Sequence, residues 1–355
     1  MSTDSSAPVV HFGGPDTPPR HLRDVLAARI AAVPGGGRID WVTYYLRDRG
    51  LTEALLVARA RGVGVCLTLE GHPRTPTAND RTCARLAPVL GRDLRLSRSP
   101  FDGLRGLRKW RPRLHEKLYC FSHPTPLALV GSFNPSGDRP EEDADVASAI
   151  GDQDRGHNAL VEIRDPALAA GLAEHARRIH ARPHSTLERF LPGQNRPLEG
   201  AGLTVHFRPR AAPDPALALL ARCGRGARVR LTGSHLSGRT APEALRAAAA
   251  RGATIEVIAE ATERRVPARV EERLREAGIW IRRLAEPGVP MHLKLLLVER
   301  DGERSAAFGS FNWTDNSIHH NRELVVVSRE PGLFDCFAER FETLRRRLAD
   351  LRLER

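Results

Sequence analysis

Apolar and polar positions alternate along the chain between strand-like and helix-like stretches. Short apolar runs such as Ile39–Tyr45 and Val63–Leu69 are typical of buried strands. Between such runs, apolar residues recur at the spacing of one helix face, as in Leu22–Val33. Strands that alternate with helices predict an α/β fold.

The same series of predicted elements occurs twice. Val9–Phe12, Leu22–Val33, Ile39–Tyr45 and Val63–Leu69 correspond to Thr204–Phe207, Pro215–Cys223, Val229–Thr232 and Thr254–Ile258. Corresponding positions are 190 to 195 residues apart. The chain is therefore expected to be an internal duplication.

The duplication predicts two similar βαβ-type halves that pack as one α/β sandwich, with one site at their interface. A length of 355 residues exceeds the usual size of a single hydrophobic core and agrees with this organisation. A stretch rich in Pro and Gly separates the repeats. The predicted units are residues 1–183 and 203–355, joined by a linker at 184–202. The pattern does not indicate how the halves pair.

Charge adds a statement about partners. The chain has 55 basic and 43 acidic residues, a formal charge of +12, which favours anionic partners such as nucleic acids, phospholipid head groups or phosphate esters. An arginine-rich genome would produce the same balance. The type of cation is more informative, because the only lysines are Lys109, Lys117 and Lys294, and two of them follow a histidine by two positions.

Cysteine usage and hydropathy indicate the environment. The five cysteines are scattered and form no Cys-x-x-Cys pair, which indicates neither a disulfide framework nor a zinc ribbon. No apolar stretch has the length needed to cross a bilayer, and the N-terminus lacks the pattern of a signal peptide. We expect a cytoplasmic protein without an integral membrane segment; peripheral contact with anionic surfaces and the oligomeric state stay open.

Two short motifs repeat at a different offset. Leu114–Leu118 (LHEKL) matches Met291–Leu295 (MHLKL) at an offset of 177 residues, and Gly131–Asn134 matches Gly309–Asn312. The smaller offset means that the first half holds roughly a dozen extra residues before its motif, assigned to Phe101–Arg113. One His-x-Lys pair is common, but two copies at matching distances within a chain-wide repeat indicate function.

The motifs have the residue types that a phosphodiester reaction needs. On a strand, alternation would place His115 beside Lys117, and His292 beside Lys294. An imidazole can act as nucleophile or proton donor near neutral pH, and an ammonium can bind a non-bridging phosphate oxygen. The Ser and Asn of Gly-Ser-Phe-Asn offer further donors. No His, Asp and Glu cluster has metal-ligand spacing, and His319-His320 is interpreted as part of a turn.

These paired elements resemble the HKD motifs of the phospholipase D superfamily, over nearly the whole chain. The resemblance implies a pseudo-two-fold sandwich of two phospholipase D-like halves. It also implies that His115 is the nucleophile and His292 the general acid. Lys117, Lys294, Asn134 and Asn312 would bind phosphoryl oxygens, Ser132 and Ser310 would support substrate binding, and Glu323 would orient a catalytic histidine.

The chain departs from this pattern at the acid of H-x-K-x4-D, where it has Ser122 and Glu299. That acid is generally structural in the family, and tyrosyl-DNA phosphodiesterases lack it. The counterpart of Glu323 is either Asp145, by counting from Asn134, or Asn158, by aligning the following strand; the second is preferred. Glu323 is then assigned to the second motif copy and Asn158 to the first.

The basic segment before His115 has two interpretations. Arg108, Lys109 and Trp110 could form a rim that binds a polyanionic substrate, with the indole stacking on a base or entering a lipid interface. The segment could equally be a solvated basic loop. The acidic run Pro140–Asp145 is interpreted as a solvated loop rather than a metal site.

The sequence therefore predicts a phosphodiesterase of the phospholipase D type that works through a phosphohistidine without metal or cofactor. Phospholipid is the first choice of substrate, for hydrolysis or for transfer. A nuclease acting on DNA or RNA is the alternative, favoured by the charge and the basic loop. An inactive protein that binds phosphate or nucleic acid is the third reading.

Overall fold

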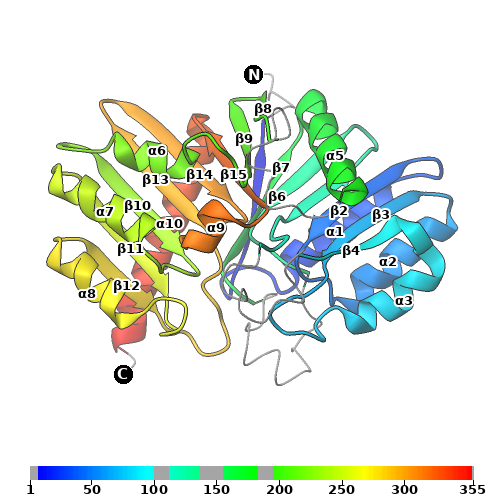
Figure 1. Ribbon diagram of the computed structural model, residues 1–355, viewed down its shortest axis with the longest axis horizontal. Helices are drawn as coiled ribbons and strands as arrows, with labels where there is room; N and C mark the ends of the chain where they lie inside the picture. Colours follow the sequence, from blue (N-terminus) through cyan, green and yellow to red (C-terminus); the bar gives the residue numbers. More distant parts are fainter. Residues whose placement is uncertain (1–6, 100–111, 136–154, 183–194, 354–355) are drawn as a thin grey trace.

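The computed structural model describes residues 7–99, 112–135, 155–182 and 195–353. Two β-sheets lie next to each other in one molecule, each built by one half of the sequence (Figure 1). Arg108, Lys109, Trp110 and Asp145 lie outside the described residues.

In its described part, the first half forms a seven-stranded sheet in the order β1-β7-β6-β5-β2-β3-β4. Its elements are β1 (Val9–Gly13), α1 (His21–Ala32), β2 (Arg38–Thr43), α2 (Arg49–Ala60), β3 (Gly64–Glu70), α3 (Asp80–Leu90), a 3₁₀ turn (Gly91–Asp93), β4 (Leu94–Ser97), β5 (Leu118–Phe121), β6 (Leu127–Gly131), β7 (Asn158–Ile163) and α5 (Pro166–Ala181).

The described part of the second half forms an eight-stranded sheet in the order β12-β11-β10-β13-β14-β15-β9-β8. Its elements are β8 (Leu198–Gly200), β9 (Leu203–Arg208), α6 (Pro215–Ala221), β10 (Arg228–Gly233), α7 (Thr240–Ala250), β11 (Thr254–Glu260), α8 (Ala268–Glu276), β12 (Trp280–Leu284), β13 (Leu295–Arg300), β14 (Glu303–Gly309), α9 (Asp315–His319), β15 (Glu323–Ser328) and α10 (Pro331–Leu353).

The two sheets repeat the same topology. Read from β1 and from β9, the orders β1-β7-β6-β5-β2-β3-β4 and β9-β15-β14-β13-β10-β11-β12 correspond strand by strand. This confirms the predicted α/β fold and the duplication. The strand β8 lies within the predicted linker and pairs with β9, so this end of the linker belongs to the second sheet.

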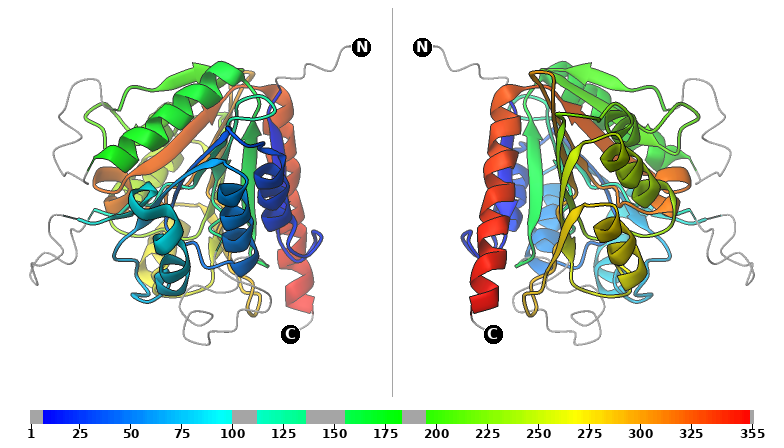
Figure 2. Two further views of the ribbon diagram at one scale, coloured as in Figure 1. Left: turned by 90° about the vertical axis from the view of Figure 1, so that its right-hand side faces the viewer. Right: turned by 90° about the vertical axis from the view of Figure 1, so that its left-hand side faces the viewer.

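Alternation along the central strands divides the interior into three cores. On β5, Leu118 and Cys120 face the central core, whereas Tyr119 and Phe121 face the core under the outer helices. The helices α1, α2 and α3 cover the outer side of the first sheet, and α6, α7 and α8 that of the second. The central core lies between the sheets and includes α5 and α10, so that the layers form an αβαβα sandwich (Figure 2).

Aspartates begin three of these helices. Asp48, Asp165 and Asp214 precede α2, α5 and α6, and each side chain accepts a hydrogen bond from a backbone N–H of the first turn. Proline follows Asp165 and Asp214, where its missing N–H removes no helical hydrogen bond. These caps determine where the chain turns from a strand into a helix.

Candidate active site

The two His-x-Lys segments lie where the halves meet. The segment His115–Lys117 precedes β5, and His292–Lys294 precedes β13. The backbone N–H of His115 donates to the carbonyl of Arg322 at 2.9 Å, and that of His292 to the carbonyl of His157 at 3.0 Å. Each histidine thus bonds to the opposite half. Reciprocal contacts arise when equivalent segments meet about a two-fold axis, so the structure confirms the predicted pseudo-two-fold sandwich.

The prediction that the His-x-Lys segments lie within strands is wrong. The strands β5 and β13 begin at Leu118 and Leu295, directly after the two lysines. The preceding backbone bonds to the other half instead of extending a neighbouring ladder. Lys117 Nζ donates to the carbonyl of His115 at 2.7 Å, and Lys294 Nζ to that of His292 at 2.6 Å.

Each motif histidine forms a hydrogen bond with a side chain from the other half. His115 Nδ1 lies 2.9 Å from Glu323 Oε2, and His292 Nδ1 lies 2.9 Å from Asn158 Oδ1. The assignment of Glu323 to the second motif copy and Asn158 to the first is therefore wrong. The partners are exchanged because the first residues of β7 and β15 cross the interface. Asn158, the first residue of β7, occupies the place equivalent to Glu323, the first residue of β15, as the strand alignment predicts.

The serines of Gly-Ser-Phe-Asn hold these partners rather than line the pocket. Ser310 Oγ donates to Glu323 Oε2 at 2.7 Å, and Ser132 Oγ donates to Asn158 Oδ1 at 3.0 Å. Both serines are buried. A further serine, Ser317, donates to Glu323 Oε1 at 2.8 Å. The prediction that Ser132 and Ser310 bind substrate is corrected, because their hydroxyls are engaged beneath the pocket.

The asparagines and lysines of the motifs surround the histidines. Asn134 and Asn312 line the pocket, and among the described residues neither buried Oδ1 has a hydrogen-bond partner. Lys117 and Lys294 are fully buried and are not among the residues that line the pocket, but both lie close enough to His292 to lower its pKa. Burial lowers the pKa of Lys117 to about 7 and that of Lys294 well below its usual value.

Electrostatics keeps both imidazoles neutral at neutral pH. Burial lowers the pKa of His115 to about 4, although the Glu323 carboxylate opposes this shift. Burial also lowers the pKa of His292, and the nearby Lys294 lowers it further. Burial acts to raise the pKa of Glu323, but His115 and Lys117 outweigh it and hold that carboxyl ionised. A neutral histidine backed by a carboxylate is the state that a nucleophile requires.

Two glutamates that the motif comparison missed fix the chain before each histidine. Glu70 Oε2 accepts from the backbone N–H of Leu114 at 2.7 Å, and Glu260 Oε2 accepts from that of Met291 at 2.7 Å. They end β3 and β11, 190 residues apart. That constant offset is a sequence signal that could have identified them.

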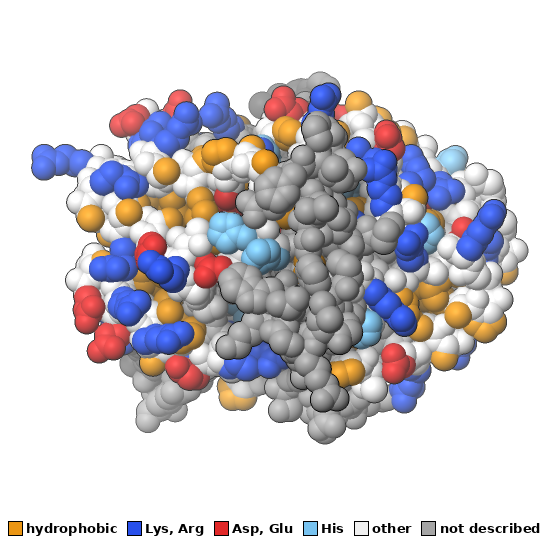
Figure 3. Space-filling model, in the orientation of Figure 1, with side chains coloured by type: hydrophobic (Ala, Val, Ile, Leu, Met, Phe, Trp, Pro, Cys, Tyr) orange, Lys and Arg blue, Asp and Glu red, His pale blue; other side chains and the backbone are white. Residues whose placement is uncertain are grey.

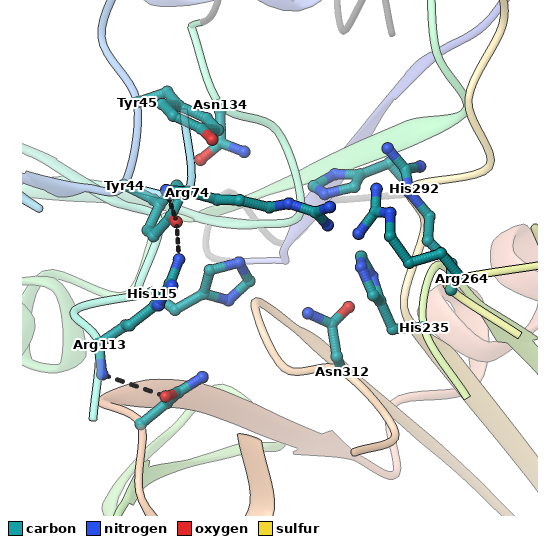
Figure 4. A pocket seen from close by; sticks show the side chains of 12 residues that line it. Tyr44, Tyr45, Arg74, Arg113, His115, Asn134, His235, Arg264, His292 and Asn312 are labelled. Atoms are coloured by element: carbon teal, nitrogen blue, oxygen red, sulfur yellow. Dashed lines mark hydrogen bonds between the residues drawn. The ribbon is translucent and has the colours of Figure 1, made fainter. Parts of the chain in front are cut away.

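Further residues of the pocket escaped the sequence reasoning. The pocket, about 150 Å³ in volume, is lined by His115, His292, Asn134, Asn312, Tyr44, Tyr45, Arg74, Arg113, His235, Arg264, Arg265 and Asn321 (Figure 4). Pockets that enclose drug-sized ligands measure about 300–1,000 Å³, so this one accommodates a small group such as a phosphodiester. The loops after the strands provide several of these side chains without a motif.

Tyr44 packs against the first histidine. Its ring lies edge-on to that of His115, with 5.2 Å between the centroids. Its hydroxyl accepts from Arg113 Nη1 at 2.6 Å and from the backbone N–H of Arg74 at 2.7 Å. These contacts fix the wall of the pocket beside His115.

The two residues at the position of the family aspartate lie away from the pocket. Ser122 Oγ accepts from the backbone N–H of Arg38 at 2.7 Å, and Glu299 Oε1 accepts from Arg230 Nη2 at 2.7 Å. Both contacts tie β2 or β10 to its neighbouring strand, so the departure from the family pattern does not alter the pocket.

Within the described residues, no group of three or more His, Cys, Asp or Glu side chains is arranged to hold a metal ion. In that same part of the chain, no helix combines the length and hydropathy of a membrane span. All five cysteines are free thiols.

Comparison with known proteins matches parts of the chain at the sequence level. A family model described as a cardiolipin synthase, PLD-like domain, matches residues 218–345. Mitochondrial cardiolipin hydrolase from Homo sapiens is 38% identical over 71 residues, which is 20% of this chain and 27% of that protein. The corresponding protein from Danio rerio is 41% identical over 68 residues, 19% of this chain and 29% of its own length. The matches thus span less than a third of these relatives.

Solved structures match nearly the whole fold. Phosphatidylserine synthase from Haemophilus influenzae aligns with a TM-score of 0.64 at 12% identity, covering 96% of this chain and 86% of its own. Polyphosphate kinase from Porphyromonas gingivalis gives a TM-score of 0.64 at 16% identity, covering 96% of this chain and 47% of its own. At these identities the likeness concerns the fold alone.

Proposed function

Because the chain belongs to the phospholipase D superfamily, we propose that it cleaves a phosphodiester through a covalent phosphohistidine at His115. The observation that carries the proposal is the pair of crossed contacts, His115 with Glu323 and His292 with Asn158. Since each Nδ1 is held by its partner, each Nε2 is left for the pocket that both histidines line.

In the first step, the Nε2 lone pair of His115 attacks phosphorus and forms a P–N bond as the P–O bond to the leaving alcohol breaks. The leaving oxygen takes a proton from His292. The imidazole of His115 becomes positively charged, and the Glu323 carboxylate stabilises that charge. In the second step, water or an alcohol gives its proton to His292 and attacks phosphorus, which breaks the P–N bond.

The unlike partners support this division of roles. A carboxylate at Nδ1 strengthens His115 as a nucleophile and stabilises its cation. The neutral amide of Asn158 leaves His292 a stronger acid, suited to releasing a proton. A bound phosphodiester carries negative charge, which raises the pKa of His292 and favours its protonation when substrate is present.

The phosphoryl oxygens would be held by the motif lysines and asparagines. Lys117 and Lys294 are buried and donate to the carbonyls of His115 and His292, so they would act on the substrate through their charge. The amides of Asn134 and Asn312, which line the pocket, would supply neutral donors. A bound anion also restores the charged state of Lys117, whose pKa burial has lowered to about 7. Substrate and lysine charge are thus expected to stabilise each other.

The names of the curated relatives support a phospholipid substrate, since both are cardiolipin hydrolases. A second candidate, a nucleic-acid strand, is favoured by a different observation. No aliphatic side chain lines the pocket among the described residues, and the formal charge is +12, with Lys and Arg spread over both halves (Figure 3). Whether the acceptor is water or an alcohol decides between hydrolysis and transfer.

The mechanism can be tested with bis(p-nitrophenyl) phosphate, cardiolipin vesicles and single-stranded DNA in parallel, each with and without EDTA. We expect turnover that resists EDTA and is lost in His115→Ala and in His292→Ala. His123→Ala, on the turn at the far end of β5, serves as the matched control. Turnover abolished by EDTA, or retained in both histidine variants, would contradict the mechanism.

The intermediate provides a direct measurement. With a labelled substrate quenched during turnover, wild type should carry a phosphoryl group that is labile to acid and stable to alkali, at His115 by peptide mass. His292→Ala should still accumulate it from a substrate with an activated leaving group such as p-nitrophenol, because such a group leaves without protonation. A label on His292 instead would mean that His292 is the nucleophile and His115 the proton donor.

A further inference from the structure

Loops from both halves bring arginines to the mouth of the pocket. Arg74 follows Glu70, the last residue of β3, by four positions, and Arg264 follows Glu260, the last residue of β11, by four positions. The two arginines are therefore equivalent in the repeat. Both are exposed, and they reach into the same pocket from opposite sides (Figure 4).

Two more basic side chains line the same pocket. Arg265 is buried and lines the pocket, with its Nη1 3.6 Å from Glu260 Oε2. His235 also lines the pocket, and its Nδ1 lies 3.1 Å from Ser234 Oγ, which leaves Nε2 for a ligand. We refer to Arg74, Arg264, Arg265 and His235 as the mouth cluster.

Like charges are close enough here to affect one another. The pKa of Arg74 is lowered, first by burial and then by the charge of Arg265. That of His235 is lowered by burial and then by Arg265. Within the described residues, no carboxylate forms an ion pair with Arg74. Holding cations together costs free energy that an anion between them would offset.

The mouth cluster supplies more charge than one phosphodiester uses. A phosphodiester carries a single negative charge. Asn134 and Asn312 already line the pocket beside His115 and His292, and the buried Lys117 and Lys294 lie close enough to lower the pKa of His292. The mouth cluster lines the same pocket and lies outside both motifs in the sequence. A substrate with another anionic group next to the scissile bond would use it.

We infer that the mouth cluster is a second anion subsite, which binds the phosphate adjacent to the scissile one in a single-stranded nucleic acid. The inference rests on the proposed phosphodiesterase function and specifies its substrate. Guanidinium groups match phosphate oxygens in geometry and charge.

Three observations favour a nucleic-acid strand over a lipid. The described pocket lining contains no aliphatic side chain. The large hydrophobic side chains that are exposed in the described residues, Val57 and Val89, lie on α2 and α3 at the outer face of the first sheet. The pocket instead offers the aromatic Tyr44 and Tyr45, and the Tyr45 hydroxyl is buried without a partner among the described residues. Aromatic and cationic linings are typical of single-strand binding.

The test compares two oligonucleotides that differ in one charge. Each has a single cleavable phosphodiester, flanked on one side by a normal phosphate or by a neutral methylphosphonate. We expect wild type to prefer the charged neighbour on one side of the scissile bond by about tenfold or more in kcat/KM. The preference should fall toward unity in Arg264→Ala and in Arg74→Ala, whereas Arg269→Ala, on the exposed face of α8, should keep it.

Binding by the His115→Ala variant separates this inference from the proposed function. Fluorescence anisotropy with a labelled oligothymidylate should show affinity that falls with salt, and adding Arg264→Ala should reduce the slope of log K against log salt by about 0.7. If this holds while wild type cleaves no substrate, the subsite stands and the proposed function fails. Equal binding of the charged and neutral oligonucleotides overturns the subsite.

A lipid arm tests the rival occupant. Cardiolipin has two phosphates on one glycerol, and phosphatidylglycerol has one. The inference is overturned if wild type prefers cardiolipin over phosphatidylglycerol, this preference depends on Arg264, and the oligonucleotides show no preference for a charged neighbouring phosphate. In that case the mouth cluster binds a lipid. Cleavage of the oligonucleotides with the expected preference, and no such lipid preference, supports it.

Discussion

The two motif histidines differ by one functional group next to Nδ1. His115 faces the carboxylate of Glu323, and His292 faces the amide oxygen of Asn158, at the same distance of 2.9 Å. The supporting serines are equivalent, since Ser310 and Ser132 each hold the partner. The chemical difference between the histidines therefore depends on residues 158 and 323.

Replacing Asn158 by Asp should move the alkaline limb of the pH profile. The new carboxylate stabilises the protonated form of His292 and raises its pKa. Because the general acid must carry a proton, activity is lost as pH rises through that pKa, so the loss should occur at higher pH in the variant. The measurement is kcat/KM against pH, and an unmoved alkaline limb would exclude His292 as the proton donor.

Replacing Glu323 by Gln should remove most activity. Without the carboxylate, the positive charge that develops on His115 loses its stabilisation, and kcat should fall about 10²- to 10⁴-fold with little change in KM. Glu299→Gln is the control, since Glu299 bonds to Arg230 outside the pocket. A fall in both variants would point to a general loss of fold rather than to orientation of His115.

The acid limb should reflect His115 itself. Its pKa is lowered to about 4, chiefly by burial, and it attacks only when neutral. Activity should thus persist well below pH 6.5 and fall as pH drops toward 4, which stopped assays with bis(p-nitrophenyl) phosphate can follow. A midpoint near 6.5 would mean that substrate or solvent reverses the effect of burial.

At this scale the sequence predicted the motif residues and their partners Glu323 and Asn158, but not which histidine each partner contacts. His115, His292 and both asparagines could be found because the motifs that contain them occur twice at matching spacing. Glu323 was identified from family resemblance, but it was assigned to the wrong histidine. The spacing of residues along the chain does not indicate which side chains pair across the interface. Arg74, Arg264 and His235 escaped because they lie on loops outside any motif.

At the scale of elements, the halves differ where α5 packs on the first motif. Glu116 is buried, and its carboxylate lies 3.0 Å from His175 Nε2 on α5. The ring of His175 stacks on Phe207 of β9, with 3.8 Å between the centroids. The equivalent of Glu116 in the second half is Leu293, which is buried in the apolar central core. The first half thus uses a polar pair where the second uses an apolar contact.

Breaking this pair on one side should destabilise the protein. His175→Ala leaves the Glu116 carboxylate buried without its partner, which costs about 3–5 kcal/mol of the free energy of unfolding. Glu116→Leu combined with His175→Phe keeps the stack on Phe207 and should be neutral or stabilising by about 1–4 kcal/mol. Urea unfolding at pH 7 measures both, and an unaffected His175→Ala would show that the pair contributes nothing.

Elements were predictable where apolar periodicity was long and uninterrupted. The strand–helix series from β1 to β3 and from β9 to β11 agrees with the pattern because each element buries one regular face. The His-x-Lys segments were misassigned, since their alternation looks strand-like while their backbone bonds to the opposite half. A periodicity argument contains no information about that partner.

At the scale of the whole molecule, buried and half-buried histidines gather where the halves meet. The pKa values of His115, His157, His235 and His292 are all lowered, in each case chiefly by burial. In the unfolded chain these imidazoles bind a proton near pH 6.5. Below that pH the unfolded state binds more protons than the folded state, so stability falls as pH falls.

The free energy of unfolding should therefore decrease as the pH is lowered from 7 to 5. His115 alone contributes a loss of about 2 kcal/mol over this range. Lowered carboxyl pKa values, such as about 2 for Glu162 and Glu286, act only below about pH 4.5 and do not confuse this window. Chemical unfolding at the two pH values gives the difference, which should be smaller in His115→Ala; an equal difference would assign the pH dependence elsewhere.

The duplication was predictable from the repeat, but the way the halves meet was not. Each half shows its own apolar faces, and nothing in that pattern specifies which faces form the central core around α5 and α10. The reciprocal bonds from His115 to Arg322 and from His292 to His157 reveal the two-fold relation in the structure.

The exchange of orienting residues between halves has a consequence for how such an enzyme can evolve. In a dimer of identical chains, symmetry would place the same residue beside both histidines. One chain that carries both copies can hold glutamate at 323 and asparagine at 158. With both copies in one chain, a single substitution can change the surroundings of one histidine alone, so selection can adjust the two histidines independently.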